Sequence, residues 1–302
     1  MKNFLIAMVI SVGCYFLGWQ VANNWGAGVL TALFGFVLTY FILLRRSFKK
    51  LNNLIQEAMG VVQQAQSLQD PNAQLRQLDE GIQIMKKGFS LSSEQFLMKG
   101  ILNGQVGALE YQAGSILMQL KLREELQHQS VKARKFQSKA NARFKEAKVY
   151  LEKANEQSWQ TKLTRNWHSM AMLAALQFRE GEKEEAIKNL KKVKGPGSSD
   201  PLYWGMLTWM LYDNNQPEDG LIAVTEGLSK NEESAALKDM ANCIQNKKSL
   251  SFVKFGMNWF MFFPDHLTRD AAMKLQMEMQ EQGNEGAAPM NRAMRRQMKR
   301  KT

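Results

Sequence analysis

The segment that most constrains this chain is residues 3–44, which contain no charged side chain. Two adjacent asparagines, Asn23 and Asn24, divide it into apolar stretches of 18 and 20 residues, at about 4–21 and 25–44. A helix needs about 20 apolar residues to cross the roughly 30 Å of hydrocarbon in a bilayer. The sequence therefore predicts a transmembrane hairpin over 1–46, with the asparagines in the turn.

The charges that flank this hairpin indicate its orientation. Lys2 precedes the first stretch, and four cations follow the second: Arg45, Arg46, Lys49 and Lys50. Short cytoplasmic segments of membrane proteins are rich in Lys and Arg. We therefore expect a multi-pass protein of the cytoplasmic (inner) membrane, with both termini in the cytoplasm. The alternative is a cleaved signal peptide over the first stretch, which would leave one span; no convincing small-x-small cleavage motif supports it.

Residues 47–90 are predicted to form amphipathic helices next to the membrane. Asp70 and Pro71 mark a helix start, as N-cap and first helical residue. Within 51–68, two sets of apolar residues recur every seven positions, as in a coiled-coil seam. This seam either packs on the chain's own domain or joins two copies in a homo-oligomer. Its members are Leu51, Leu54, Ala58, Val61, Ala65 and Leu68.

The body that follows is predicted to be all-α, because strand-like alternation is hard to find after residue 45. Ser92 and Gln95 have the spacing of a capping box, which predicts a helix start there. Within 91–250, small and apolar residues recur at an offset of 34 positions, a period typical of paired-helix repeats. The matched groups are Ala113, Leu117 and Leu120 with Ala147, Leu151 and Ala154, and Ala186, Leu190 and Val193 with Gly220, Val224 and Gly227.

The clearest unit, which begins at Trp167, resembles a tetratricopeptide repeat (TPR). Ala174 and Ala186 stand where this repeat requires small side chains, and Gly181 stands at its interhelix turn. The resemblance is good over 167–234 and weaker over 94–157. It implies that 91–250 form a TPR-like α-solenoid of antiparallel helix pairs, with a concave surface for peptides or partner helices. The alternative is an irregular helical bundle.

In the TPR arrangement, the first helix of each pair lines the concave surface. The resemblance thereby implies a partner groove that contains His168, Phe178 and Arg179 of one unit and Trp209 and Tyr212 of the next. Trp209 and Tyr212 lie three positions apart, and aromatic side chains are frequent anchors at protein interfaces. The alternative is that both pack in the core between repeats.

The segment 251–282 begins with a dense group of aromatic residues. Its first twelve positions, 252–263, are too few to span a bilayer as a helix. They either cap the exposed end of the solenoid or lie in the membrane interface beside the hairpin. The aromatic residues are Phe252, Phe255, Trp259, Phe260, Phe262 and Phe263.

Residues 283–302 are predicted to be a linker and a basic tail. Such a tail suits contact with an anionic membrane surface, binding to RNA or ribosome phosphates, or a solubilising role. A second basic stretch, 132–148, is interpreted mainly as a solvated helix face. The tail cations are Arg292, Arg295, Arg296, Lys299, Arg300 and Lys301.

No motif for catalysis, cofactor binding or metal binding is present in the sequence. The three histidines have no neighbours at ligand spacing, and Cys14 and Cys243 form no paired motif. We therefore expect a protein without enzymatic activity, cofactor or metal. The predicted function is a membrane-anchored scaffold or adaptor for a protein partner at the cytoplasmic face. The alternative is a membrane-associated RNA- or ribosome-binding protein that acts through its tail.

Overall fold

The computed structural model describes residues 1–68, 70–95, 97–156 and 166–286. All regular secondary structure in these ranges is helical, which confirms the all-α prediction for them. The chain divides into two compact units. The first unit contains residues 1–120 and 135–197, and the second contains 121–134 and 198–302.

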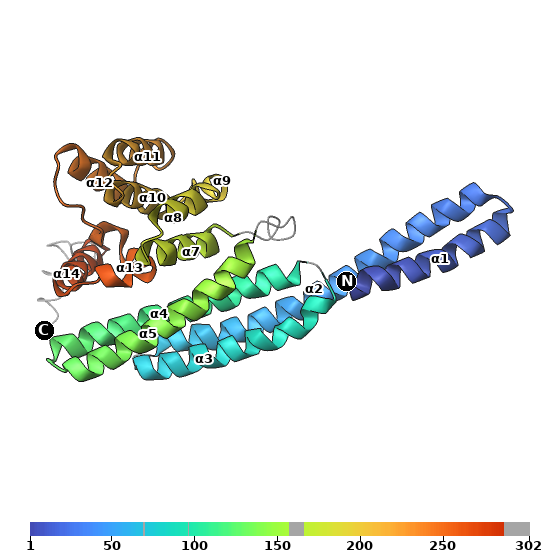
Figure 1. Cartoon of the computed structure of the whole chain (residues 1–302), viewed down its shortest axis with the longest axis horizontal. Coiled ribbons are helices and arrows are strands. Elements are labelled where there is room, and N and C mark those ends of the chain that lie inside the picture. The colour runs from blue at the N-terminus through green and yellow to red at the C-terminus, as the bar shows by residue number, and fades with distance from the viewer. Residues whose placement is uncertain (69, 96, 157–165, 287–302) are drawn as a thin grey trace, which may run out of the picture. The chain divides into compact units, whose positions relative to one another are not determined.

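The two N-terminal helices form an antiparallel hairpin, α1 (Lys2–Ala22) and α2 (Trp25–Ser67) (Figure 1). Asn23 has a φ of 45°, a left-handed conformation that Asn tolerates better than most residues. Asn24 caps α2 by accepting a hydrogen bond of 2.8 Å from the backbone N–H of Gly26. The helices approach closely, because a Cβ added at Gly18 would lie only 2.0 Å from Oγ1 of Thr31.

α2 continues well beyond the end of the apolar stretch. In its first half, Leu30 and Phe34 are 69% and 70% exposed, whereas Leu51 and Ala58 in its second half are 2% and 0% exposed. The predicted second span and the first juxtamembrane helix are therefore one continuous helix of 43 residues. The side chains of α2 therefore change from mostly exposed to partly buried within about two turns after residue 44.

The second half of α2 packs against α3 (Pro71–Lys87), which begins at the expected cap. The carboxylate of Asp70 accepts hydrogen bonds from the backbone N–H groups of Asn72 and Ala73. A homo-oligomer through residues 51–68 stays a prediction. Part of this seam is buried within the same chain, since Ala58 belongs to a core cluster with Leu54 and Val61 packed against it. Its core neighbours are Leu78, Ile82, Ile84, Met85, Val106, Leu109 and Ala113.

The helix predicted to start at Ser92 starts later. A 3-10 helix, η1 (Gly88–Ser93), follows α3, and α4 (Met98–Leu126) begins after it. The hydroxyl of Ser92 donates to the carbonyl of Phe89. Gln95 is buried, and its Oε1 accepts a hydrogen bond from the hydroxyl of Tyr40. The capping box is absent because both side chains are used in other contacts.

The two expected repeat units within 94–157 instead form one pair of long helices, α4 and α5 (Ser130–Asn155), of 29 and 26 residues. Glycines on α4 allow close packing: a Cβ added at Gly107 would lie 2.8 Å from Leu151, and one added at Gly114 would lie 2.6 Å from Phe144. In this part of the chain, the 34-residue offset therefore relates two facing long helices and not two helix pairs.

A shorter helix pair, α7 (Trp167–Arg179) and α8 (Lys183–Lys191), is followed by the single turn α9 (Lys194–Gly197). Ala174 and Ala186 are both fully buried. Gly181 has a φ of 90° at the turn between the helices, a conformation that glycine adopts without strain. The two small side chains and the glycine turn thus allow close packing of this helix pair, and the TPR resemblance stays a prediction.

The second unit contains another helix pair, α10 (Pro201–Asp213) and α11 (Pro217–Lys230), followed by α12 (Ala235–Gln245). The chain then forms η2 (Val253–Phe255), α13 (Met257–Phe262), η3 (Pro264–His266) and α14 (Arg269–Gly286). The pairs α7–α8 and α10–α11 belong to different units. Their stacking into a solenoid therefore stays a prediction.

Candidate functional site

A polar cluster lies where the apolar hairpin meets the helix bundle, and we call it the junction: Asn3, Ser47, Lys50 and Glu94. Nδ2 of Asn3 donates to Oγ of Ser47 at 2.8 Å, and this hydroxyl donates to Oε2 of Glu94 at 2.6 Å. Nζ of Lys50 lies 3.0 Å from Oε1 of Glu94. The junction thus connects the start of α1, the middle of α2 and the segment before α4.

The junction keeps Glu94 charged. The hydrogen bond from Ser47, followed by the one from Lys50, holds the pKa of Glu94 below its ordinary value, although partial burial opposes this. Hydrogen bonds to an ionised group are stronger than neutral ones. Because Asn3 and Ser47 are 6% and 2% exposed, water competes little for the hydrogen bond between these two side chains. The open end of the hairpin is therefore firmly attached to the bundle.

Sequence reasoning did not identify Asn3, Ser47 or Glu94. Glu94 is the only acidic residue between Glu80 and Glu110, and Asn3 and Ser47 are polar positions close to the ends of the apolar run. These signals mark each residue as unusual. None of them indicates that the three side chains meet.

A second charge cluster, which we call the bundle network, surrounds Glu110 on α4. Glu110 is fully buried, and its carboxylate lies 3.1 Å from Nζ of Lys86 and 2.7 Å from Nη1 of Arg143. Lys86 also contacts Glu146 at 2.8 Å, and Arg143 contacts Asp79. Burial opposes the charge on Lys86, yet hydrogen bonds to Glu146 and Glu110 raise its pKa. The network links α3, α4 and α5, which is a structural role.

These contacts divide the basic stretch 132–148 into two groups. Arg143 belongs to the bundle network, and Lys148 pairs with Glu180 and Glu182 beside α7. In contrast, Lys135, Lys139 and Lys145 are exposed and take part in no ion pair within the described ranges. Part of this stretch therefore stabilises the fold, and part is available at the surface.

Of the three predicted groove residues on α7, Phe178 and Arg179 pack against other residues of the first unit. Phe178 is 6% exposed. The guanidinium carbon of Arg179 lies 4.5 Å from the ring centre of Phe144, and Nη2 of Arg179 donates to Oδ1 of Asn141. His168 is exposed, and its ring centre lies 3.8 Å from that of its neighbour Trp167.

The other two predicted groove residues, Trp209 and Tyr212, lie on α10 in the second unit. The ring centre of Trp209 lies 4.5 Å from that of Phe263 and 4.7 Å from that of His266. Trp209 thus packs in an aromatic cluster formed with the 252–266 segment of its own unit. Tyr212 is half-buried. Since α7 and α10 belong to different units, a groove that joins all five residues stays a prediction.

The aromatic segment packs on α10 within the second unit. Trp259, Phe260, Phe262 and Phe263 are each at most 6% exposed. The ring of Phe255 lies over Gly205, where an added Cβ would be only 2.4 Å away. These contacts bury much of the segment within its own unit, and its role as the cap of a solenoid stays a prediction.

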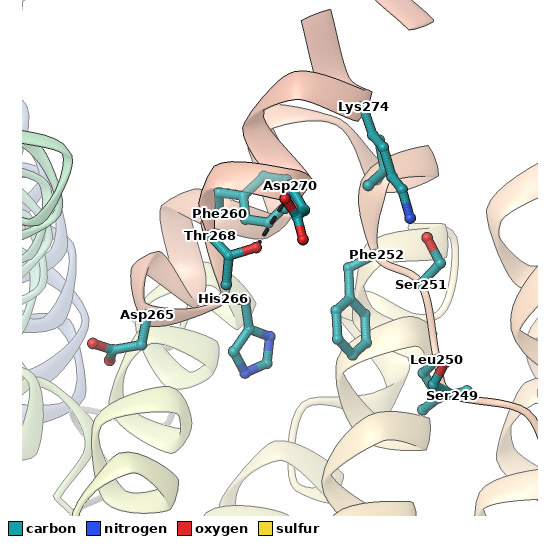
Figure 2. Close-up of a pocket in the computed structure, with 12 residues that line it drawn as sticks. Ser249, Leu250, Ser251, Phe252, Phe260, Asp265, His266, Thr268, Asp270 and Lys274 are labelled. Atoms are coloured by element: carbon teal, nitrogen blue, oxygen red, sulfur yellow. Dashed lines mark hydrogen bonds between the residues drawn. The ribbon is translucent and has the colours of Figure 1, made fainter. Parts of the chain in front are cut away.

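This aromatic cluster forms one side of a pocket of about 420 Å³ in the second unit. The side chains of Phe252 and His266 line it, Ser251 and Lys274 lie on the side of Phe252, and Asp265 is directed away from the two rings (Figure 2). The centres of the Phe252 and His266 rings are 5.0 Å apart. The pocket therefore combines aromatic faces with hydroxyl and charged groups.

His266 is the most buried titratable group in this pocket. Nε1–H of Trp259 donates to its Nδ1 at 3.0 Å, so the ring proton is assigned to Nε2. Burial lowers the pKa of His266, although Asp265 and Asp213 act in the opposite direction. The ring is therefore neutral at pH 7. Among the described residues, no group of three or more His, Cys, Asp or Glu side chains is placed to hold a metal ion.

Two N-terminal helices of this all-helical chain are long and apolar enough to span a membrane, by length and composition. Comparisons with protein-family models, curated proteins and solved structures give no match. The predicted basic tail, Arg292, Arg295, Arg296, Lys299, Arg300 and Lys301, lies outside the described residues.

Proposed function

We propose that this protein is an integral membrane scaffold. The hairpin of α1 and α2 spans the cytoplasmic membrane, and the helical body binds a protein partner in the cytoplasm. One observation carries the proposal: a single continuous helix, α2, exposes Leu30 and Phe34 in its first half and buries Leu51 and Ala58 in its second. Soluble proteins rarely expose so large a contiguous apolar surface. Lipid around the first half of α2 removes that surface from water.

The orientation follows from the charges at the open end of the hairpin. Lys2 and the cations that follow residue 44 all lie at this end, whereas the turn at Asn23 and Asn24 carries no charge. The positive-inside rule places such an end in the cytoplasm. The body continues from the same end and is therefore cytoplasmic.

Membrane insertion is tested by alkaline carbonate extraction of intact membranes. The wild-type chain should stay in the membrane pellet, and protease added to sealed right-side-out vesicles should leave the body intact. The double variant Leu30→Arg and Phe34→Arg should be released, because each Arg at the centre of a span costs about 2.5–3.5 kcal/mol. The matched control, Gln63→Arg and Gln64→Arg, changes exposed positions of the same helix and should stay in the pellet. Release of the wild-type chain contradicts the proposal.

We place the partner-contact site at the pocket beside Phe252 and His266. This pocket combines aromatic faces with hydroxyl and charged groups, which suits recognition of a protein segment, and helix pairs such as α10–α11 are typical scaffolds for such contacts. A photo-crosslinking residue at Ser251 or Lys274 should give a discrete adduct in intact membranes. The same residue at the exposed Lys238 on α12 is the control and should give none. The absence of adducts at both pocket positions contradicts this placement.

A second candidate function is binding to RNA or to ribosomes. It is favoured by the exposed cations Lys135, Lys139 and Lys145, and by the basic tail predicted from the sequence. Deletion of residues 290–302 should then abolish salt-sensitive co-sedimentation with RNA or ribosomes, because phosphate contacts weaken steeply with salt. Unchanged co-sedimentation excludes the tail as the binding element.

A further inference from the structure

We propose that the open end of the hairpin carries a binding surface for anionic phospholipid headgroups, formed by Arg45, Arg46 and Lys49. This inference rests on the membrane insertion proposed above. It adds to that proposal a lipid class and the residues that recognise it. The surface differs from the basic tail and from the cations of α5.

The three cations lie on one face of α2. With about 100° between successive helical residues, they fall within an arc of about 100°. Ser47 and Leu51 lie on the opposite face, where both are 2% exposed, and Ser47 is bonded to Asn3. All three cations are exposed. Their charged groups therefore point away from α1 and from the bundle.

The carboxylate of the junction, Glu94, already has partners. Glu94 is bonded to Ser47 and Lys50, and no ion pair involves Arg45, Arg46 or Lys49 within the part of the chain that the structure describes. The segments 1–3, 45–50 and 93–95 carry five Lys or Arg side chains and one acid, a net charge of +4. This surface therefore has uncompensated positive charge.

The position of the three cations along α2 indicates which ligand is within their reach. Residue 44 is the last of the apolar stretch, so Arg45 and Arg46 begin the next helical turn, where the headgroups lie. Lys49 lies about one turn, or about 5.4 Å, further on. Guanidinium groups match phosphate oxygens in a bidentate geometry. Lipid phosphates reach this level in any bilayer, whereas a protein or nucleic acid would have to displace the headgroups first.

The test measures lipid preference directly. The full chain is reconstituted in phosphatidylcholine vesicles that contain spin-labelled phosphatidylglycerol or spin-labelled phosphatidylcholine, and the motionally restricted fraction of each label is compared. The wild-type chain should prefer phosphatidylglycerol. The triple variant Arg45→Gln, Arg46→Gln and Lys49→Gln should lower this preference at least about threefold, since one cation near an anionic surface is worth about fivefold before screening by salt.

Two further variants establish whether charge at this position is the cause. The matched control Lys135→Gln, Lys139→Gln and Lys145→Gln also removes three exposed cations, but from α5, and it should keep the wild-type preference. The pair Arg45→Lys and Arg46→Lys retains the charge and should keep most of the preference. Raising the ionic strength should weaken the wild-type preference.

The outcomes separate this inference from the proposed anchor. Carbonate extraction of the same vesicles reports insertion, so a released wild-type chain overturns both proposals. An inserted wild-type chain without a preference for phosphatidylglycerol overturns the lipid surface alone. The same conclusion follows if the α2 and α5 triple variants lose equal preference.

Discussion

Nδ2 of Asn3 lies 2.8 Å from Oγ of Ser47, which joins the first turn of α1 to α2 across 44 residues of sequence. This bond joins the two helices at the open end of the hairpin, which lies opposite the turn at Asn23 and Asn24. Through Ser47 it also reaches Glu94, which belongs to the segment before α4. The hairpin is therefore attached to the bundle both by the continuous backbone of α2 and by side chains.

Glu94→Gln should destabilise the junction. The substitution removes the charge that Ser47 and Lys50 share, and we expect a loss of about 1–2 kcal/mol. The measurement is the thermal unfolding midpoint of the full chain in detergent micelles. Glu57→Gln changes an exposed carboxylate on α2 and should alter stability by less than about 0.5 kcal/mol. Equal effects of the two variants would show that the junction does not stabilise the fold.

The junction should also make stability depend on pH. Because the pKa of Glu94 is lowered in the folded protein from 4.5, its contribution is fully present above that unfolded value. The contribution is lost as the pH falls through the lower folded pKa. The difference in unfolding free energy between the wild-type chain and Glu94→Gln should be constant from about pH 6 to 8 and shrink below about pH 4.5. A difference that grows with acidity contradicts this.

Removing the charge of Glu110, at the centre of the bundle network, should lower the free energy of unfolding more than Glu94→Gln does. Glu110→Gln leaves Lys86 and Arg143 without their buried carboxylate, and we expect a loss of about 3 kcal/mol. Glu146→Gln removes a carboxylate whose side chain is 43% exposed and should cost less than about 1 kcal/mol. Urea unfolding of the full chain in micelles compares the two. Similar losses of unfolding free energy in the two variants would mean that the burial of a carboxylate does not determine its contribution to stability.

Two Gly→Ala substitutions should have opposite effects on stability, because only one of the two glycines is closely packed. A Cβ at Gly227 would lie 2.7 Å from Cβ of Trp204, which is fully buried. Gly227→Ala should therefore destabilise the protein by about 1–3 kcal/mol. A Cβ at Gly60, within α2, meets nothing within 4 Å, so Gly60→Ala should stabilise by about 0.5–1 kcal/mol. The measurement is again the unfolding midpoint, and the same sign for both variants would contradict the prediction.

Trp209 should behave as a core residue and not as a partner anchor. Trp209→Ala leaves a cavity among Phe252, Phe263 and His266, and we expect a loss of about 2–4 kcal/mol. Tyr212 is half-buried like Trp209 but has no ring contact within the described ranges, so Tyr212→Ala should cost about 1 kcal/mol or less. Near-ultraviolet circular dichroism during thermal unfolding measures both. Unchanged stability of the Trp209 variant would restore the interpretation of this residue as a groove anchor.

Several features of this fold follow from the sequence alone because they depend on near neighbours. The apolar run predicts the two N-terminal helices by its length. Asn23 and Asn24 predict the turn, and Asp70 predicts the start of α3 through hydrogen bonds to residues two and three positions away. Gly181 likewise marks the turn between α7 and α8. For the turns and the cap, backbone conformation and hydrogen bonding within about four residues are sufficient.

Other features are decided only by the tertiary structure. The spacing of Ser92 and Gln95 predicts a cap, yet contacts with Phe89 and Tyr40 occupy both side chains. The 34-residue offset in 94–157 is as compatible with two facing long helices as with a repeat. Trp209, Glu94 and Glu110 meet partners from distant parts of the chain. A sequence pattern records which side chains are apolar or charged, but it does not record which distant segment packs on them, and that packing determines their role.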